Sequence, residues 1–597
     1  MAALLLFGNY QAKAVSTTDE EPDKASAFEQ RIQELGLDEI VNDYSETKKI
    51  IIAEPSCAYI NITGTDKMPG KKGEAMNVWI EAYLDNGNYF RKRAIIDAQG
   101  NSSLRFEKKN FTADFCDDEW IGDETPAITF GDWVKQDSYH FKAYYNDYLR
   151  GVAVAGYRLY DQIALNSGRP WTRAVENISK PKENARCYPD GFPCMVYLNG
   201  DFYGIFAWQL KKHRDNMNQT KTVAGHIHLD GKLGDETFWQ TDSIQWGEFE
   251  VRNPKSLYTM DGRKYDGDHP SELIDETSEY FDLEDDDETT KANKERTAQV
   301  KRYIVSLSRI YGQMEQMEGE QTDNETLRAF FEEHFDIKSL IDYACFHFAV
   351  YNYDGFTKNW QWYTYDGNKW FVAPYDLDCI IGNTFTGNYV TPPDYSIWLR
   401  TNGPFYWINK YYFNDIRTRY GELRNENIFS ADNICALLED WYYRVGDNYD
   451  YEWQRWPNSI CINDIVTGQG WKHVEDTYAY WQYNIYDESK EYTPGERCQL
   501  DYLVWEATDT VCGVKPYIRL GYRDSLERYE SWVAKRLEIM DDYLNYEPET
   551  ITTSMTLHEK SDSYIIYDAT GRRRSGLNKG LNILLYDNGT VKKLLKH

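Results

Sequence analysis

The sequence predicts an α+β protein with a small separate β module at its C-terminus. Three observations support this fold class. Residues 50–116 alternate apolar and polar side chains between Gly/Asn turns, as strands with one buried face do. From "AQVKRYIVSLSRIYGQMEQ" onward, apolar residues recur at the three-to-four spacing of amphipathic helices. The tail, residues 554–597, is β-like, punctuated by glycine and basic at its end.

Size and charge narrow the function classes. The chain has 597 residues, which is too many for one hydrophobic core. Its formal net charge of −31 argues against nucleic-acid binding, which needs clustered Lys and Arg to neutralise phosphates. No run approaches the roughly eighteen apolar residues of a membrane span. The 49 Tyr and 19 Trp suit a buried core and also suit a sugar-binding surface, and composition alone does not separate these.

The N-terminus predicts export. Residues 1–14 hold a short apolar run followed by Ala-Lys-Ala, which fits a signal-peptide cleavage site, so we expect a secreted or cell-surface protein. Residues 15–49 are polar and are expected to be loose, apart from a short helical stretch near 26–43. In an oxidising location, Cys187 and Cys194 are expected to form a disulfide, because the turn "YPDGFP" joins them. Cys498 and Cys512 are the next candidates.

The elements follow in order along the chain. Strands are expected in "SCAYINITG", "MNVWIEAYLD", "NYFRKRAIIDAQG" and "SLRFEKKNFTADF", and a helix in "DYLRGVAVAGYRLYDQIALNSG". Asn199–Gly200 and Asp366–Gly367 each lie between two β-rich runs, which predicts two hairpins. Residues 214–300 are polar and irregular, so we expect an insertion or surface loop there. Helices are expected again within 404–450 and 515–546.

One stretch carries residues suited to phosphoryl transfer. Asp354 and Asn359 have the spacing D-x-x-x-x-N after a hydrophobic helix, and the second hairpin then ends at Asp376 and Asp378. Protein kinases use an Asp beside the attacking hydroxyl, and an Asn and a second Asp to hold magnesium against the phosphates. The alternative is that Asp354 caps a helix or turn and Asp376 lies in another turn.

A second element lies upstream in "IDAQGNSSLRFEKKNF". The loop Gly100, Asn101, Ser102 and Ser103 follows a strand, and backbone N–H groups of such a small-residue loop can bind phosphate. A lysine on the next strand can then reach the same phosphate. The alternative is a hairpin turn with surface lysines.

Several blocks, taken in order, resemble the CotH (spore coat protein H) atypical kinases. They are "GNSSLRFEKKNF", "YNDYLRGVAVAG", the NGxYxGxY-like hairpin "VYLNGDFYGIFAWQ", "YNYDGFTKNWQWYTYDGNKWFVAPYDLDCIIG", "FNDIRTRYGELR" and "YIRLGYRDSLERYESWVAKRLEIM". The resemblance covers roughly residues 50–546. It implies a two-lobed, protein-kinase-like fold and ATP-dependent phosphorylation of protein side chains with Mg²⁺ or Mn²⁺.

By motif, the resemblance also implies a role for each site residue. Asp354 matches the catalytic Asp, while Asn359 and Asp376 match the metal-holding pair, with Asp378 beside them. The loop of Gly100, Asn101, Ser102 and Ser103 and a lysine, Lys109 or Lys108, would contact the nucleotide. Strand parity places Lys109 on the face of Phe111 and Ala113, which favours Lys109 over Lys108.

Two features of the sequence support an alternative interpretation. Many members of the family carry a glutamate after the NGxYxGxY hairpin, where this chain has Leu210 and its neighbours Trp208, Gln209 and Lys211. The tail resembles sorting or anchoring modules of secreted Bacteroidota proteins. The alternative to a kinase with an unknown protein substrate is therefore a weak or inactive kinase-like scaffold that serves as a surface adhesion or glycan-binding protein.

Overall fold

The structure is a computed structural model, and part of the chain falls outside its description. The described residues are 25–116, 127–174, 185–232, 244–352, 355–356, 358–387, 390–393, 403–459, 462–474, 480–522, 525–547, 564–568, 573–574, 580–586 and 591–596. Contacts divide the chain into two compact units, residues 1–546 and residues 547–597. The predicted signal peptide and Asp354 lie outside the described residues.

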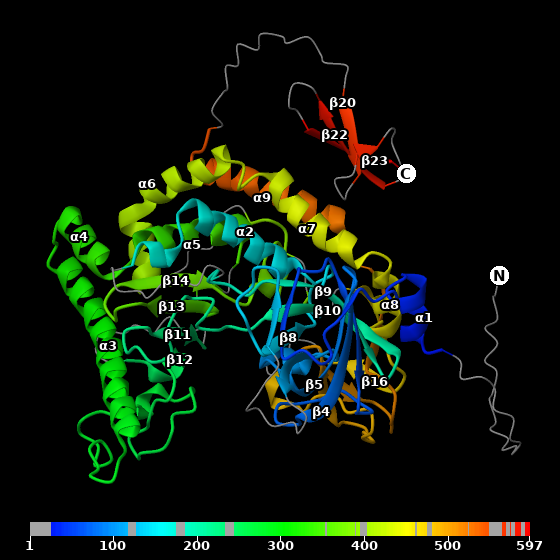
Figure 1. Cartoon of the computed structure of the whole chain (residues 1–597), viewed down its shortest axis with the longest axis horizontal. Coiled ribbons are helices and arrows are strands. Elements are labelled where there is room, and N and C mark those ends of the chain that lie inside the picture. Colours follow the sequence, from blue (N-terminus) through cyan, green and yellow to red (C-terminus); the bar gives the residue numbers. More distant parts are fainter. Residues whose placement is uncertain are drawn as a thin grey trace, which may run out of the picture. The chain divides into compact units, whose positions relative to one another are not determined.

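The first architectural feature is a closed, barrel-like sheet, drawn mostly in blue and cyan in Figure 1. Its order is β1-β5-β4-β3-β9-β10-β8-β6, and β6 pairs back onto β5 to close it. The strands are β1 (Asn42–Asp43), β3 (Ala58–Thr63), β4 (Met76–Leu84), β5 (Asn88–Gln99), β6 (Asn110–Cys116), β8 (Ser138–Lys142), β9 (Gly191–Leu198) and β10 (Asp201–Leu210). Neighbours pair antiparallel, except β1 with β5 and β3 with β9.

The alternation of apolar and polar residues decides which side chains enter this sheet. Along β4 and β5 every second residue is buried, which is the period-two pattern of a strand with one face in a core. The enclosed core contains several large rings in contact, and Trp208 stacks on Phe115 and meets Phe130 edge to face. The predicted hairpin at Asn199–Gly200 is confirmed, since β9 and β10 pair directly across it.

The segment before this sheet is more ordered than we expected from its polarity. Helix α1 (Ala27–Glu34) buries Phe28 and Ile32 against Tyr59 and Tyr197. The short strand β2 (Lys49–Ile52) pairs in parallel with β7 (Ala127–Phe130). The short helix expected within 26–43 is therefore confirmed as α1, because two apolar residues one helical turn apart are enough to dock it. The expectation of a loose segment is wrong for Asn42–Asp43, which pairs with β5.

A second sheet has four strands in the order β12-β11-β13-β14. They are β11 (His228–Gly231), β12 (Phe249–Asn253), β13 (Trp360–Thr364) and β14 (Trp370–Pro374). The predicted hairpin at Asp366–Gly367 is confirmed as the β13–β14 turn. The expectation of a polar insertion over 214–300 is corrected, because β11 and β12 lie in that stretch and extend the hairpin's sheet. These strands have only four or five residues, so their alternation is too short to stand out from a polar context.

Helices cover this second sheet. In Figure 1 the four-stranded sheet lies between the barrel-like sheet and helices α3 and α4, and α6, α7 and α9 lie across the top. Aspartate caps the N-termini of three helices, through Asp287, Asp323 and Asp336. The helices are α2 (Val152–Asn166), α3 (Glu288–Gly319), α4 (Asn324–His334), α5 (Ile337–Val350), α6 (Gly403–Asn425), α7 (Ala431–Val445), α8 (Asn448–Arg455) and α9 (Leu526–Tyr543). Nearly all of α5 is buried, so this helix forms the centre of the larger core.

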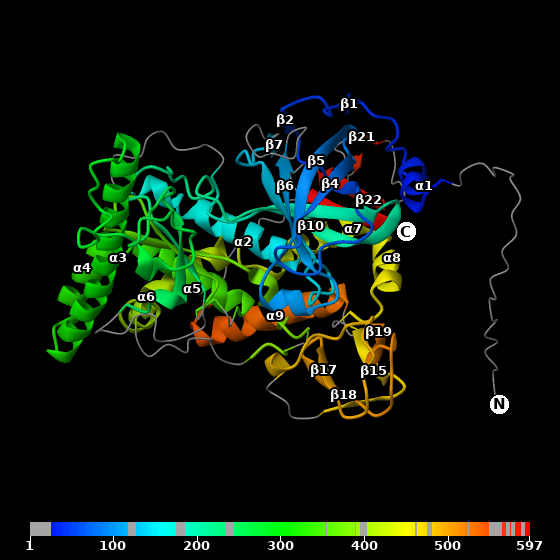
Figure 2. The same ribbon diagram turned by 90° about the horizontal axis from the view of Figure 1, so that it is seen from below.

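Smaller elements complete the chain. Figure 2 shows β15 (Ile462–Thr467), β17 (Arg497–Leu500), β18 (Leu503–Ala507) and β19 (Tyr517–Tyr522) grouped near α8. β16 (Trp471–His473) pairs with β18, and β15 pairs with β19. The unit at 547–597 forms a four-stranded sheet of β20 (Tyr564–Asp568), β21 (Arg573–Arg574), β22 (Gly580–Tyr586) and β23 (Val591–Lys596). The short 3₁₀ turns are η1 (Ser102–Arg105), η3 (Pro170–Thr172), η5 (Trp246–Glu248), η6 (Pro270–Glu272), η7 (Leu377–Cys379) and η8 (Tyr480–Gln482).

The predicted Cys187–Cys194 disulfide is wrong, because both residues are buried free thiols. Residues from Gly191 onward belong to β9 rather than to a turn, so Cys194 lies in the sheet core opposite Phe206. Cys187 packs in another cluster, where its sulfur accepts a hydrogen bond from the Tyr363 hydroxyl at 3.6 Å. Cys498 and Cys512, the next candidates, are free thiols as well.

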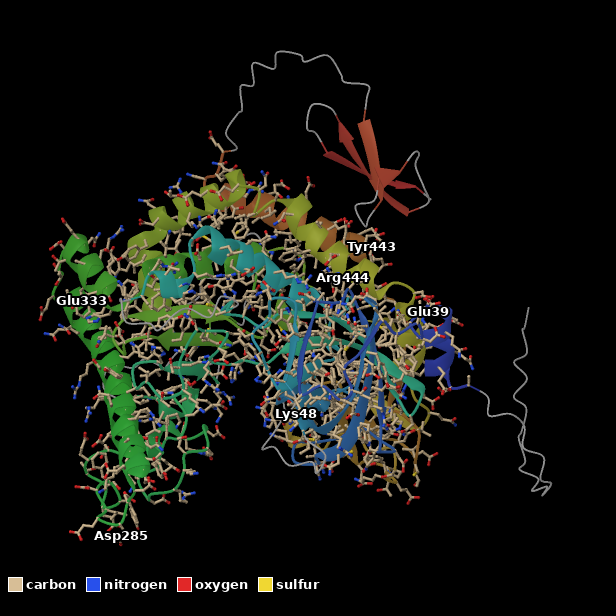
Figure 3. All side chains as sticks on the ribbon, in the orientation of Figure 1. Glu39, Lys48, Asp285, Glu333, Tyr443 and Arg444 are labelled. Carbon is tan, nitrogen blue, oxygen red and sulfur yellow. The ribbon has the colours of Figure 1, made fainter. Side chains whose placement is uncertain are left out.

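The outer surface is polar. Exposed acidic side chains such as Asp285 and Glu333 project from the outside of the molecule, as Figure 3 shows. Among the helices in the described ranges, none combines the length and the apolar composition that a membrane crossing requires.

Candidate active site

A cavity of about 980 Å³ lies where the barrel-like sheet meets the four-stranded sheet. Its walls come from the loop after β5, the ends of β8 and β10, strands β11 and β12, and the segment after β14. The predicted site residues that line it are Gly100, Asn101, Ser102, Ser103, Lys108, Asn359, Asp376 and Asp378. Residues as much as 278 positions apart in sequence thus meet in one place. Lys109 is not among the lining residues, and Asp354 lies outside the described part of the chain.

The β13–β14 hairpin brings Asn359 and Asp376 together. Trp360 pairs with Pro374 at the open end of the hairpin. One residue further out, the Tyr375 N–H donates to the Asn359 carbonyl at 2.9 Å. Both Asn359 and Asp376 adopt left-handed backbone conformations, with φ of 60° and 51°. Asn and Asp tolerate that region better than most residues. The chain therefore turns sharply at both ends of the hairpin, so that two oxygen-bearing side chains are held at its open end.

The backbone of Asp376 is anchored from a different element. Its N–H donates to the Tyr157 hydroxyl of α2 at 3.0 Å. The carboxylate itself is about one-third exposed toward the cavity, and Lys142 of β8 places its ammonium 3.8 Å from one carboxylate oxygen. Asp378 lies in the next turn, η7, where its carbonyl accepts a hydrogen bond from the Asn146 side chain at 3.2 Å. One carboxylate thus remains open to the cavity while its main chain is fixed.

These residues suit a hard divalent cation. Asn359 and Asp376 offer amide and carboxylate oxygens, the donors that Mg²⁺ and Mn²⁺ prefer. The described residues hold no cluster of three His, Cys, Asp or Glu side chains that would bind a metal unaided. Magnesium in phosphoryl-transfer sites is commonly held by one or two carboxylates and completed by substrate phosphates, so the donor set fits that arrangement.

The loop after β5 closes another wall of the cavity. Gly100 has φ of 114°, and a Cβ at this position would come within 2.1 Å of the Ser103 hydroxyl oxygen, so only glycine fits. The Asn110 amide holds the loop in place, since it donates to the Ser103 hydroxyl at 3.1 Å and accepts from the Ala143 N–H at 2.7 Å. The loop is thereby tied to the end of β8, next to Lys142.

The two predicted lysines precede the strand rather than lie in it, because β6 begins at Asn110. The strand-parity argument that favoured Lys109 therefore does not apply. The Lys109 ammonium donates to the Phe106 carbonyl, and burial lowers its pKa to about 8. The Lys108 side chain is completely buried at the cavity wall, where it donates to the Ile205 carbonyl and to Glu452 of α8 at 2.7 Å.

Glu452 is the centre of a buried charge network. One of its carboxylate oxygens accepts from Lys108 at 2.7 Å and from Arg150 at 2.8 Å, and the other accepts from the Ile205 N–H at 2.8 Å. Burial alone would raise the pKa of Glu452, but the adjacent Lys108 and Arg150 lower it below its ordinary value. A Cβ at Gly204 would come within 2.7 Å of the Lys108 side chain and 3.0 Å of Glu452. Gly204 of the β9–β10 hairpin therefore makes room for this pair.

The cavity is cationic although the chain is strongly acidic. Ten lysine and arginine residues line it, against five carboxylates. The cations are Lys72, Lys108, Lys142, Lys211, Lys212, Arg214, Lys232, Arg252, Lys255 and Lys358, and the carboxylates are Asp230, Glu250, Asp268, Asp376 and Asp378. A concave surface with this excess of positive charge attracts polyanions such as phosphates.

The comparisons with known proteins identify a family. The sequence profile described as CotH kinase protein matches residues 96–485, which is more than half of the chain. This chain belongs to the CotH kinase family. A search of curated proteins found no match.

The family match covers the cavity loop, Lys142, the hairpin and Glu452. The sequence resemblance predicts a glutamate near Leu210 that this chain lacks, and the structure shows a different carboxylate, Glu452, beside Lys108. Glu452 comes from α8, 344 positions after Lys108 in the chain. No local pattern signals this residue, because the pairing depends on how α8 packs against β10.

Lys142 was not predicted as a site residue, although its position in the sequence is unusual. It is a single lysine in the apolar run "YHFKAYY", and it is largely buried at the end of β8. A lysine in an otherwise apolar strand is rarely buried without a partner or a ligand. That observation alone would have added Lys142 to the candidates.

Proposed function

We propose that this CotH kinase transfers the terminal phosphoryl group of ATP to hydroxyl groups of protein side chains. The observation that carries the proposal is the convergence of a small-residue loop, a buried lysine and the Asn359/Asp376 pair on one cationic cavity. Phosphoryl transfer depends mainly on positioning and on charge stabilisation, and these groups can supply both. We propose further that the barrel-like sheet and the helical part act as the two lobes of a kinase-like fold.

Each group has a distinct task in this proposal. Backbone N–H groups of the Gly100–Ser103 loop and the Lys142 ammonium bind phosphate oxygens of ATP. Asn359 and Asp376, with Asp378 beside them, hold Mg²⁺ or Mn²⁺, which neutralises charge on the phosphates when bound. Asp354 orients the acceptor hydroxyl and accepts its proton. The hydroxyl oxygen forms a bond to the γ-phosphorus as the bond to the β–γ bridging oxygen breaks, which yields ADP and a phosphomonoester.

Lys142 takes the phosphate-contacting task in place of Lys109 and Lys108. Its amine faces the cavity within reach of Asp376, whereas the Lys108 amine already has two acceptors in a fully buried position. Lys108 then serves to hold the segment that follows the cavity loop. This assignment follows the geometry and departs from strand parity.

Two aspartate variants test the proposal. Asp376→Ala should abolish metal-dependent ATP binding, because it removes the open carboxylate, and Asp354→Ala should keep much of that binding while losing transfer. Binding is measured by calorimetry with ATP and Mg²⁺ or Mn²⁺, and transfer by incorporation of labelled phosphate. Glu333→Ala, an exposed carboxylate on α4 away from the cavity, is the control. Wild-type protein that binds no nucleotide would refute the kinase proposal in favour of the scaffold alternative.

We also propose that the protein acts outside the cytoplasm, on the basis of the Ala-Lys-Ala site within residues 1–14. Sequencing the N-terminus of protein recovered from its producing cells tests this directly. A mature N-terminus near residue 15 is the expected result, and an intact N-terminus in the cytoplasmic fraction would contradict it.

A further inference from the structure

A group of cations lies along one side of the cavity, beyond the residues assigned to the nucleotide. We call it the basic rim, and it consists of Lys211, Lys212, Arg214, Arg252 and Lys255. These residues come from the segment just after β10, from β12 and from the residues just after β12. The two segments belong to different sheets, so the fold brings the cations together across the junction of the sheets.

The rim begins next to the proposed reaction centre. The Lys212 ammonium lies 4.0 Å from the centre of the Tyr375 ring, and Tyr375 directly precedes Asp376. A cation this close to an aromatic face is held in a defined position. A protein segment that presents a hydroxyl group near Asp376 would therefore pass beside the rim.

The rim is only partly neutralised by the protein itself. Asp230 is buried and forms ion pairs with two cations, Lys212 and Arg252, the latter at 3.2 Å. Arg252 also forms an ion pair with Glu250. Burial alone would raise the pKa of Asp230, but these two cations lower it, so that the carboxylate stays ionised. Lys211 reaches Asp114 at 3.5 Å.

Two cations are left over. Arg214 and Lys255 have no carboxylate within ion-pair distance among the described residues. Burial lowers the pKa of Lys255, and the positive charges of Arg214, Arg252 and Lys211 lower it further. Mutual repulsion of this kind costs stability, and a bound anion would relieve it.

An independent feature of the wall also indicates a polar ligand. His228 of β11 is buried at the cavity wall next to the Gln361 side chain, and its Nε2 completes no hydrogen bond within the described parts of the chain. Buried polar atoms normally have partners, and the exceptions are often explained by a ligand or a water molecule. His228 lies two residues from Asp230 on the same strand, so its open nitrogen belongs to the same wall as the rim.

We propose that the basic rim binds anionic side chains next to the acceptor residue, so that the preferred substrates are proteins whose acceptor hydroxyl lies in an acidic or already phosphorylated segment. This inference rests on the proposed kinase function. Carboxylates and phosphoryl groups share the chemistry that Lys and Arg recognise, and the planar guanidinium of Arg214 can bind either with two hydrogen bonds. The chain's charge of −31 repels acidic peptides elsewhere on the molecule, so their binding would have to be local.

The test measures peptide binding without nucleotide. Four fluorescein-labelled dodecapeptides carry one central serine, flanked by glutamate, by phosphoserine, by alanine or by lysine, and fluorescence anisotropy reports their affinities. We expect the glutamate and phosphoserine peptides to bind at least about tenfold more tightly than the alanine peptide, and 0.5 M NaCl to remove most of that advantage. The ratio of the first two affinities separates carboxylate from phosphoryl recognition.

Rim variants assign the binding to these residues. Arg214→Ala combined with Lys255→Ala should weaken the glutamate peptide about tenfold or more, and changing both residues to glutamate should favour the lysine peptide. Lys264→Glu is the matched control, because Lys264 is an exposed lysine nine positions after Lys255 that does not line the cavity. Thermal melts confirm that each variant folds.

The outcomes separate the inference from the kinase proposal. Equal binding of the glutamate and alanine peptides, or unchanged binding by the rim variants, overturns the inference. ATP calorimetry on the same preparations tests the kinase proposal independently. If the protein binds ATP and phosphorylates neutral or basic peptides as well as acidic ones, the kinase proposal stands and the inference about the basic rim is refuted. Protein that binds the glutamate peptide but no ATP supports the rim and refutes the kinase.

Discussion

Replacing Glu452 by alanine should loosen the connection between α8 and the segment that follows the cavity loop. Glu452 and Lys108 have no exposed side-chain surface, and Arg150 has none either. Removing the shared carboxylate leaves two buried cations without their counter-ion. Breaking a buried ion pair in this way costs about 3–5 kcal/mol, mostly because the remaining charge is uncompensated.

The measurement is hydrogen exchange of the amides in α8 and in the residues around Lys108. If local opening governs exchange, a cost of about 3–5 kcal/mol lowers protection between about one hundred and a few thousand-fold. Glu452→Gln keeps the size and one acceptor oxygen, so a smaller loss of about 1.5–3 kcal/mol is expected. Nucleotide affinity should fall in parallel, since η1 and Lys108 are adjacent in the chain.

A control and a rescue make the prediction specific. Gln454→Ala lies on the same helix but is exposed, so its effect should stay within about 0.5 kcal/mol. Adding Lys108→Met to Glu452→Ala should recover part of the loss, because one unpaired cation is removed. Arg150 retains hydrogen bonds to backbone carbonyls and to Ser459 in that variant. If Glu452→Ala and Gln454→Ala exchange alike, the network does not hold α8 in place and the reasoning fails.

Two further predictions concern the cavity wall. Lys142→Met should weaken ATP binding about tenfold to one hundredfold, which corresponds to the loss of one charge-assisted hydrogen bond. Lys109→Met should change ATP binding little, because the Lys109 amine donates to the Phe106 carbonyl. If calorimetry shows that Lys109→Met weakens ATP binding more than Lys142→Met does, Lys109 binds the phosphate instead. Burial lowers the pKa of His228 from 6.5 to about 4. As pH falls, the unfolded chain therefore binds a proton at this residue before the folded protein does. The free energy of unfolding should fall by roughly 3 kcal/mol in total between about pH 6.5 and about pH 4. His228→Gln should therefore flatten the fall of the melting temperature over that pH range, and parallel curves for the two proteins would contradict a neutral buried His228.

The parts of this fold that follow from the sequence are those encoded locally. Asn-Gly and Asp-Gly turns specify hairpins within a few residues, and both hairpins are present. The meeting of Asn359 and Asp376 follows from the second of these turns, because an antiparallel pair returns the chain to its starting edge. The cavity loop was identifiable for a similar reason, since its small residues lie between two strands and Gly100 has no room for a side chain.

The parts that escaped prediction depend on contacts between distant segments. Glu452 reaches Lys108 only because α8 packs on β10, and nothing near either residue indicates the partner. Cys187 and Cys194 show the opposite error, because a Pro/Gly stretch predicted to be a turn is a β-strand from Gly191 onward. β11 is too short for its alternation to be visible, yet it supplies His228 and Asp230 to the site.

The distribution of charge explains why an acidic protein can still bind an anion. Long-range repulsion from a net charge of −31 acts on every approaching polyanion, but salt screens exposed charges beyond about 10 Å at 0.1 M ionic strength. An anion bound inside the cavity lies within that distance of the lining cations, and several of these cations are partly buried, so salt screens their attraction less. In our proposal, Lys142 and the basic rim therefore select the ligand, whereas the outer acidic surface only slows non-specific association. It follows that raising ionic strength should weaken binding of an acidic peptide at the exposed rim more than binding of ATP at the more buried Lys142. A salt dependence equal for both ligands would mean that one common surface binds them, and the division of the cavity into a nucleotide side and a rim would then be wrong.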